Sequence, residues 1–358
     1  MSLSRIGRLR PFAALLLAAL LAFGLAACGS DDDSGSADTA AAAGSTSASG
    51  SGAAPEKITI AYQAIPNGDL IVKNQRWLEQ AFPDTEIEWK LFDSGGTVNE
   101  AVAASSVDIG LAGSSPVARG LSTPIEYQVP WIHDVIGRAE ALVVKDDITS
   151  IQDLRGKKIA TPLASTSHYS LLAALDRAGL SERDVDVIDA EPDDIYAAWS
   201  RGDIDGAYVW NPNLARIIGD GGRVLITSEE LAREGKTTYD LAVVTNDFAA
   251  QHPDAVTTWV QQQDRAVRLI QDSPDEAARA IGAELNITPQ EVTPQLAGLI
   301  FLTAAEQAGP DYLGGGVARN LFEAAEFNQR LGQIPAIQEE SKYVEGVNPR
   351  FAQEAAAK

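Results

Sequence analysis

From Pro55 onward, short apolar runs alternate with longer stretches in which apolar residues recur at helical spacing. Runs of four or five residues rich in Ile, Val and Leu predict strands, and the amphipathic stretches predict helices. In the first part of the chain, strands are predicted at 58–61, 87–91 and 109–112, and helices at 71–81, 98–104 and after Pro116. Repeated strand-helix alternation is typical of a parallel or mostly parallel sheet.

The same alternation restarts after Val144. It predicts a helical turn at 151–154, helices at 167–178 and 195–200, and strands at 158–160, 185–189 and 206–209. Two further strand-like runs, Ala141–Val144 and Leu241–Val244, flank this second unit. We interpret these two runs as the places where the chain crosses between two lobes. Beyond the second run the chain turns helical, with helices predicted at 254–270, 274–285, 289–299 and 315–331.

A related sequence occurs once in each predicted unit. Asp108 leads through a short strand to Gly113-Ser114-Ser115-Pro116, and Asp205 leads through another to Asn211-Pro212. The separation is about that of one strand plus the turn that begins a helix. Both turns would then lie at the carboxyl ends of parallel strands, where open α/β sheets bind ligands. The alternative is a chance similarity between two Asp-Gly turns.

The N-terminus has the layout of a secretory signal. Three arginines, Arg5, Arg8 and Arg10, precede an uncharged apolar run that ends in Leu-Ala-Ala before Cys28. This end resembles the lipobox of bacterial lipoproteins, which implies cleavage before Cys28 and acylation of its sulfur. An uncleaved membrane helix is the alternative, although the run is short for a span of about 20 residues. Residues 28–54, mostly Gly, Ser, Ala, Thr and Asp, are expected to form a flexible linker.

Charge and length narrow the class of protein. The formal charge is −22, and loss of the three arginines with the signal would leave −25. Such an acidic surface makes nucleic acid an improbable partner, and membrane attachment would depend on the acyl anchor rather than on a basic patch. About 300 residues remain for folded structure, which suits two lobes of ordinary domain size.

Motifs for catalysis or cofactors are missing. The three histidines, His133, His168 and His252, are far apart in the sequence, and the single cysteine lies at the predicted lipobox, so a zinc site is not expected. Val117 replaces the second glycine of a nucleophile elbow, and no phosphate-binding loop occurs. We expect no enzyme activity, cofactor or metal.

Hydroxyl-rich turns that begin helices are the candidate ligand contacts. Ser165, Thr166, His168 and Tyr169 lie in one such turn, and Ser114-Ser115 form another. A helix N-terminus offers unpaired N–H groups and a partial positive charge, so both turns suit an anion. Simple N-capping is the alternative, and for Ser114 we favour it.

Two residues at strand ends complete the predicted pocket. Gln63 follows the first strand, where its amide could donate to an anion. Trp210 ends the strand at 206–209 and could cover the carbon segment of a ligand, although an ordinary core tryptophan is the alternative.

Several blocks of sequence resemble the taurine-binding proteins of ABC importers, within the wider family of sulfonate, nitrate and taurine solute-binding proteins. The blocks are Phe92–Gly95, Gly113–Pro116, Glu140–Val144, Ser167–Leu175 and Arg201–Trp210, and the resemblance spans roughly residues 57 to 345. It implies a two-lobed α/β fold of the type II periplasmic-binding-protein kind. A ligand cleft would lie between lobes that are joined by two crossing strands.

The resemblance also implies a role in transport. The expected protein is an exported, lipid-anchored monomer on the outer face of the cytoplasmic membrane. It would capture taurine or a related sulfonate and deliver it to the membrane permease. The corresponding boundaries are a signal at 1–27, a linker at 28–54, a first lobe at 55–144, a second lobe at 145–240 and a return to the first lobe at 241–358.

Glu140 and Asp240 are the candidate partners of the taurine amine. Each stands at the beginning of a predicted crossing strand, and the related proteins carry acids at both matching positions. Pairing with a neighbouring cation is the alternative, since Arg138 is two residues from Glu140. Arg138-Ala139 departs from the family pattern, which leaves room for a ligand with a different amine or tail. Other alkanesulfonates, nitrate-like anions, amidine-bearing pyrimidines, an enzyme on the same fold that uses His168 or a hydroxyl, and a sensory module remain alternatives.

Overall fold

The computed structural model describes residues 54–357. The predicted signal at 1–27, Cys28 and all but the last residue of the predicted linker lie outside the described residues. Among the described residues, no helix combines the length and the apolar character that a membrane crossing requires.

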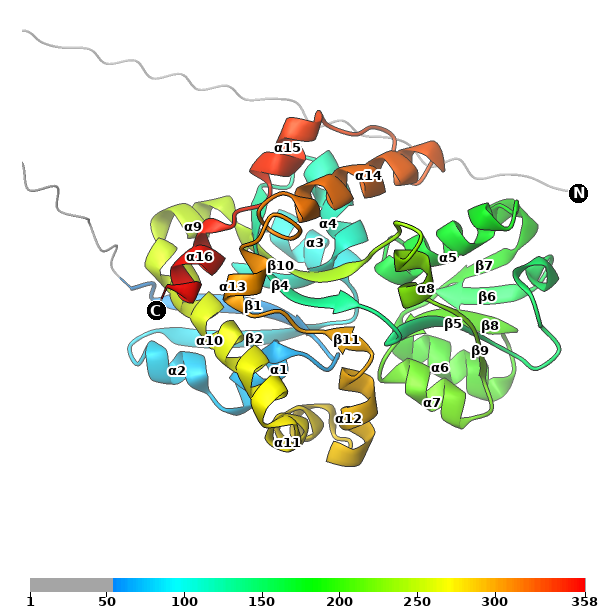
Figure 1. Ribbon diagram of the computed structural model, residues 1–358, viewed down its shortest axis with the longest axis horizontal. Helices are drawn as coiled ribbons and strands as arrows, with labels where there is room; N and C mark the ends of the chain where they lie inside the picture. Colours follow the sequence, from blue (N-terminus) through cyan, green and yellow to red (C-terminus); the bar gives the residue numbers. More distant parts are fainter. Residues whose placement is uncertain (1–53, 358) are drawn as a thin grey trace, which may run out of the picture. The chain divides into compact units, whose positions relative to one another are not determined.

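The first sheet has six strands in the order β11-β4-β10-β3-β1-β2 (Figure 1). Strand β1 pairs in parallel with β2 and β3, whereas β10 is antiparallel to both β3 and β4. The strands are β1 Lys57–Gln63, β2 Glu86–Phe92, β3 Ile109–Gly113, β4 Tyr127–Ile136, β10 Tyr239–Thr245 and β11 Leu299–Ile300.

The second sheet has five strands in the order β7-β6-β8-β5-β9. Strand β6 is parallel to β7 and β8, and β5 is antiparallel to β8 and β9. The strands are β5 Glu140–Val144, β6 Lys158–Thr161, β7 Asp186–Asp189, β8 Gly206–Trp210 and β9 Arg223–Thr227. With their helices, the two sheets form the two lobes of the fold.

Helices cover the faces of both sheets. Those packed with the first sheet are α1 Gly68–Asn74, α2 Trp77–Ala81, α3 Gly95–Ala103, α4 Ser114–Ser122, α9 Asn246–Gln251, α10 Pro253–Asp272, α11 Pro274–Leu285, α12 Pro289–Leu296, α13 Ala304–Gln307, α14 Gly316–Arg330, α15 Glu340–Glu345 and α16 Arg350–Ala356. Those of the second lobe are α5 Thr166–Arg177, α6 Pro192–Arg201, α7 Asn213–Gly219 and α8 Ser228–Ala232, with short 3₁₀ turns at Ile151–Leu154 and Glu182–Asp184.

The apolar periodicity accounts for most of these elements. Every strand predicted from a short apolar run is present, and the helices agree to within a few residues, except that the helix predicted at 71–81 is divided into α1 and α2. The amphipathic α10 buries Val256, Trp259 and Val260 against the first sheet. Strands β4, β9 and β11 are additional to the prediction, and β11 begins at Leu299, where the helix predicted at 289–299 was expected to end.

The chain crosses between the sheets at positions that differ from the prediction. Glu140–Val144 pairs on both edges within the second sheet, so the first crossing is the segment 137–139 that precedes this strand. Leu241–Val244 likewise belongs to the first sheet, and the second crossing is the segment 233–238 between α8 and β10. The predicted boundary at 144/145 is therefore displaced to the N-terminal side of Glu140. Apolar runs identify strands but not the sheet to which they hydrogen-bond.

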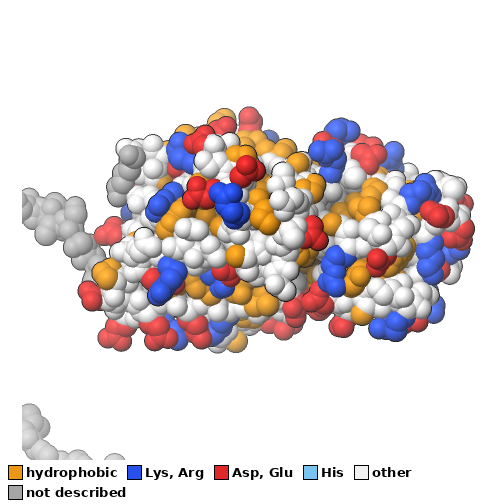
Figure 2. All heavy atoms as spheres, turned by 90° about the horizontal axis from the view of Figure 1, so that it is seen from below, with side chains coloured by type: hydrophobic (Ala, Val, Ile, Leu, Met, Phe, Trp, Pro, Cys, Tyr) orange, Lys and Arg blue, Asp and Glu red, His pale blue; other side chains and the backbone are white. Residues whose placement is uncertain are grey.

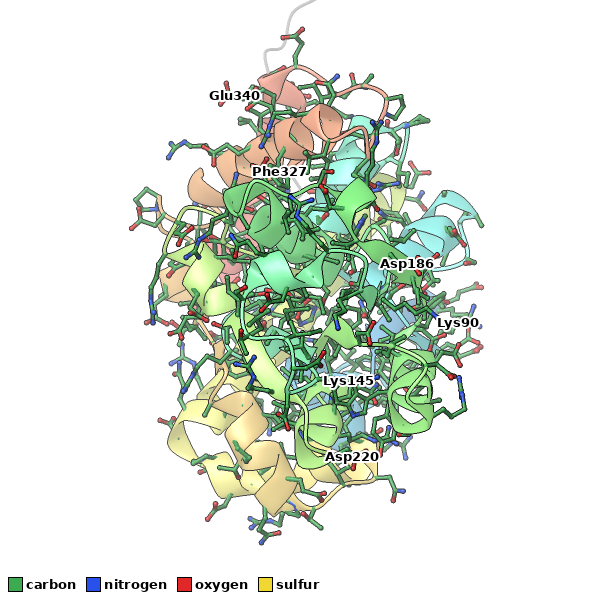
Figure 3. The ribbon with its side chains drawn as sticks, turned by 90° about the vertical axis from the view of Figure 1, so that its right-hand side faces the viewer. Lys90, Lys145, Asp186, Asp220, Phe327 and Glu340 are labelled. Atoms are coloured by element: carbon green, nitrogen blue, oxygen red, sulfur yellow. The ribbon has the colours of Figure 1, made fainter. Side chains whose placement is uncertain are left out.

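Side chains from the two lobes also meet outside the crossings. Figure 3 views the second lobe from its outer side and labels Phe327, whose ring packs edge-on against Tyr169 with 4.9 Å between centroids. Polar contacts join the lobes at three further pairs: Ser94 with Glu191 at 3.1 Å, Gln333 with Glu182 at 2.8 Å, and Arg330 with Asp176 at 3.2 and 3.3 Å. These contacts hold the lobes together around the space between them.

Figure 2 shows one face of the molecule, with acidic, basic and apolar side chains interspersed. No broad basic area occurs on this face, in keeping with the acidic composition. The chemistry that distinguishes the protein lies inside, between the sheets.

Candidate functional site

A pocket lies between the two sheets. The first lobe contributes residues at or near the ends of its strands, and the second lobe contributes the start of β5, the start of α5 and the end of β8. The volume of this cavity is about 30 Å³. The lining residues are Gln63, Ile65, Pro66, Gly95, Gly113, Pro116, Ile136, Ala139, Glu140, Ser165, Thr166, Trp210, Asn211, Asp240 and Leu299.

The pocket is acidic and contains no basic side chain. Glu140 and Asp240 line it, whereas Lys, Arg and His are absent from its described lining. Most of the other walls are apolar, so the carboxylates face an environment with few alternative partners. Such a site favours a ligand with a positive charge, because an anion alone would meet two acids and no cation.

Glu140 is surrounded by hydroxyl groups. Its side chain is 1 % exposed, and one carboxylate oxygen accepts from the hydroxyls of Thr166 at 2.5 Å and Ser167 at 2.9 Å. The other oxygen accepts from Ser228 at 2.6 Å and Ser170 at 3.3 Å. Burial raises the pKa of Glu140, and the four hydroxyl bonds act in the opposite direction by stabilising the ionised form. Glu140 also links β5 to α5 and α8.

Asp240 has a different environment. Burial, together with the nearby charge of Glu140, raises the pKa of Asp240 to about 8. None of the side-chain hydrogen bonds in the described part of the chain reaches its carboxyl group. It stands beside Gly113 on β3 and opposite Asp134 on β4. Asp240 is therefore the pocket acid that receives no side-chain hydrogen bond from the residues at 54–357.

Asp134 is a third buried acid that the sequence analysis missed. It is fully buried, and neither carboxyl oxygen has a hydrogen-bond partner among the described residues. Burial, with the charges of Asp240 and Glu140, raises the pKa of Asp134 well above its ordinary value. The signal that would have found it is the pairing of β4 with β10, which the apolar pattern did not predict.

The N-terminus of α5 is arranged differently from the prediction. Ser165 caps the helix by accepting from the backbone N–H of His168 at 3.1 Å. The hydroxyl of Thr166, a candidate anion contact, donates to Glu140, and so does the hydroxyl of Ser167. A buried carboxylate is their partner because it lies directly beside the helix start. The first-turn backbone N–H groups of Thr166 and Ser167 have no acceptor within the helix and are the donors left for a ligand.

Four predicted ligand residues lie outside the pocket lining. Ser114 accepts from the backbone N–H of Tyr239 at 3.2 Å, and Ser115 accepts from Asn328 at 3.4 Å. His168 accepts from the backbone N–H of Ala164 through Nδ1 and directs Nε2 toward Glu182, 3.4 Å away. Tyr169 packs on Phe327. Each side chain has a partner within the protein, and contact of these four residues with a ligand stays a prediction.

Two predicted strand-end residues do line the pocket. Gln63 donates one amide hydrogen to the backbone oxygen of Leu111 at 3.0 Å, which leaves its second amide hydrogen and its oxygen for a ligand. Trp210 is half-buried and stands opposite Glu140 in the β5–β8 pair. Asn211 follows Trp210 into the pocket, an addition to the predicted set. The turns after β3 and β8 both reach the pocket, through Gly113 and Pro116 in one and Asn211 in the other.

The acids do not form a metal centre. Within residues 54–357, no group of three or more His, Cys, Asp or Glu side chains is arranged to hold a metal ion. The chemistry that the pocket offers is the recognition of a small solute by carboxylates and neutral donors.

Comparison with known proteins agrees with this geometry. A family model described as NMT1/THI5 like matches residues 83–277. The chain is 36% identical over 302 residues to the taurine-binding periplasmic protein of Escherichia coli K12, covering 83% of this chain and 92% of that protein. It is 31% identical over 230 residues to a putative aliphatic sulfonates-binding protein of Bacillus subtilis 168, covering 62% and 68% of the two chains.

A solved structure shares the fold. The alkanesulfonate-binding protein SsuA from Xanthomonas axonopodis pv. citri, bound to MOPS, superimposes with a TM-score of 0.67 at 23% identity. The superposition covers 80% of this chain and 96% of that structure. The two-lobed architecture is therefore common to both chains.

Proposed function

The chain belongs to the NMT1/THI5-like family, among periplasmic proteins that bind taurine and other sulfonates, and we propose that it binds taurine and delivers it to an ABC importer. The proposed role is that of a binding protein and not of an enzyme. Its ligand would lie in the pocket between the two lobes. Delivery to a membrane permease is the role of such proteins in import.

The acidic pocket is the observation that carries the choice of taurine. Taurine has a sulfonate at one end and an ammonium group at the other, whereas a simple alkanesulfonate has the sulfonate alone. Asp240 and Glu140 line the pocket without a basic residue beside them. An ammonium group beside Asp240 gains a charge-assisted hydrogen bond worth about 1.5–3 kcal/mol, and the charge of Glu140 adds to the attraction.

The sulfonate end would be held by neutral donors. The backbone N–H groups at the start of α5 carry the partial positive charge of a helix N-terminus. The Asn211 side chain and the Trp210 indole are nearby polar groups of the lining. Because Glu140 uses the Thr166 and Ser167 hydroxyls, this assignment places the sulfonate on backbone groups rather than on the predicted hydroxyls.

Calorimetric titration at pH 8 tests the proposed ligand. We expect taurine to bind at least about tenfold more tightly than ethanesulfonate, because only taurine supplies a charge partner for the acids. Nitrate and ethylamine, each of which carries one of the two end charges, serve as controls and should bind more weakly than taurine. Equal or tighter binding of ethanesulfonate would contradict the assignment of taurine.

We also propose export and lipid anchoring through the N-terminal segment. Support comes from the arginine-rich start, the apolar run and the Leu-Ala-Ala-Cys end at Cys28. The single cysteine is then the acylation site, and residues 29–54 link the anchor to a monomeric binding protein. This arrangement would keep the pocket near the membrane permease.

Replacing Cys28 with Ala tests the anchor. In a bacterial host that processes lipoproteins, we expect the variant to leave the membrane fraction for the soluble exported fraction, since the acylated sulfur is gone. Taurine affinity of the exported protein should not change, because the residues that line the pocket all lie between Gln63 and Leu299 of the chain. Unchanged membrane association of the Cys28→Ala variant would refute anchoring at this residue.

A further inference from the structure

We propose that Asp134 is a specificity-determining residue of the pocket: as a neutral acid it donates a hydrogen bond to the Asp240 carboxylate and so positions that carboxylate for the amine. The inference rests on the proposed binding of an amino sulfonate. It deepens that proposal by making the amine-binding group a pair of acids, of which only Asp240 lines the pocket.

The backbone brings the two acids together. Asp134 and Asp240 are directly opposed in the antiparallel pair of β4 and β10. Opposed side chains in such a pair have Cβ atoms about 4.5–5.5 Å apart on the same face of the sheet. The register shifts immediately after this pair, because Leu241 pairs with Ile132 and leaves His133 as an extra residue. A bulge of this kind redirects side chains and occurs often beside binding sites.

Burial determines which form Asp134 takes. Its side chain has no exposed surface, and no donor among the described residues reaches its oxygens. An ionised carboxylate without donors in such a place is costly. The charged groups that act on Asp134 are Asp240 and Glu140, and both are acids. All of these terms favour the protonated acid, which agrees with the direction of its pKa shift.

A protonated Asp134 needs an acceptor. Asp240 is the residue that faces it, and Asp240 itself receives no hydrogen bond from a described side chain. Asp134 has a donor without an acceptor, and Asp240 has an acceptor without a donor. A hydrogen bond from the neutral acid to the carboxylate oxygen satisfies both residues. Glu140 is unsuited to be that acceptor, because four hydroxyls already donate to its oxygens.

Ligand binding then changes the proton count in a defined way. In the empty pocket at neutral pH, Asp240 also holds a proton most of the time, because its pKa lies at about 8. The arriving ammonium group stabilises the Asp240 carboxylate, and that proton leaves to solvent. Asp134 keeps its own proton and donates it in a hydrogen bond. Close to one proton should be released for each taurine bound at pH 7, and none for ethanesulfonate.

Two substitutions at Asp134 test the role. Asp134→Asn keeps a donor of the same shape, so we expect taurine affinity within about threefold of the unchanged protein. Asp134→Leu keeps the branching at Cγ and removes the donor, so we expect at least a tenfold loss for taurine and less than a twofold change for ethanesulfonate. Calorimetry in two buffers of different ionisation enthalpy gives both the affinity and the number of protons released.

Three results would overturn the inference. Full taurine affinity in Asp134→Leu would show that Asp134 has no part in recognition. An equal loss in Asp134→Asn and Asp134→Leu, with both variants folded, would show that an ionised Asp134 is required. Equal losses for taurine and ethanesulfonate in Asp134→Leu would show a structural role only.

Carboxyl carbon NMR of the empty protein separates this inference from the proposed function. We expect the Asp134 carboxyl to remain protonated at pH 7 and its protonation to persist to higher pH than that of Asp240. If the protein bound no taurine but Asp134 were protonated, the ligand assignment would fail while the acid pair stood. If taurine bound and Asp134 were ionised at pH 7, the acid-pair inference would fail.

Discussion

Replacing Asp240 with Asn should weaken taurine binding at pH 8 by at least about tenfold and should leave ethanesulfonate binding unchanged or slightly tighter. Asn keeps the shape of the side chain but cannot carry the charge that the ammonium group needs. The loss of one charge-assisted hydrogen bond, about 1.5–3 kcal/mol, corresponds to a tenfold or larger change in affinity. Isothermal titration of both ligands against both proteins measures it.

The pH dependence of the same variant gives an independent measurement. The pKa of Asp240 lies at about 8 in this structure, so below that pH a proton competes with the ammonium group for the carboxylate. Taurine affinity of the unchanged protein should therefore rise by up to tenfold per pH unit from pH 6 and level off near pH 8. Asp240→Asn should lack most of this slope. A slope that persists in the variant would assign the titrating group elsewhere.

Replacing Glu140 with Gln should cause the largest loss of all, and it should affect both ligands. Four hydroxyls donate to the two oxygens of Glu140, and the Gln amide nitrogen cannot accept from the hydroxyls on its side. Each unsatisfied buried group costs about 1–3 kcal/mol. The start of α5 would lose its attachment to β5, so we expect taurine to bind at least about a hundredfold more weakly, and ethanesulfonate also to weaken.

Denaturant unfolding complements the binding measurements on Glu140→Gln. A lower free energy of unfolding, by about 1–3 kcal/mol, is expected from the loss of the hydroxyl bonds. Glu323→Gln, an exposed change of the same chemistry on α14, is the control and should alter neither stability nor binding. Selective loss of taurine binding with normal stability would instead make Glu140 a simple partner of the amine.

The apolar pattern predicted those strands whose own residues are mostly apolar. Strands such as β1, β3 and β8 are nearly continuous apolar runs, and their burial follows from that composition. Strand β4 was missed because Pro130, His133 and Asp134 interrupt its apolar residues, although its burial between β10 and β11 is nearly complete. The polar residues of β4 are buried because the strand pairs with β10 and β11. Those strands are distant in the sequence, so the pattern of residues around β4 does not reveal the pairing.

The candidate site was predicted in part for the same reason. Glu140 and Asp240 stand at the starts of strands, and the strand starts were correctly located. The sequence could not show that the hydroxyls of α5 turn toward Glu140, because that contact joins residues 26 or more positions apart. Nor could it show that Asp134 lies opposite Asp240, because this pairing depends on the register and the bulge of the β4–β10 pair.

The division of the acids between the lobes bears on the energy of an unloaded protein. Asp240 extends from the first sheet and Glu140 from the second, so bringing the sheets together brings like charges into a space with little water. Without cargo, that approach costs electrostatic work or requires the uptake of a proton. An ammonium group between the acids attracts both carboxylates, so closure of the lobes around the ligand becomes electrostatically favourable. At a pH above the pKa of Asp240, repulsion between the two carboxylates would therefore oppose closure of the lobes around an empty pocket.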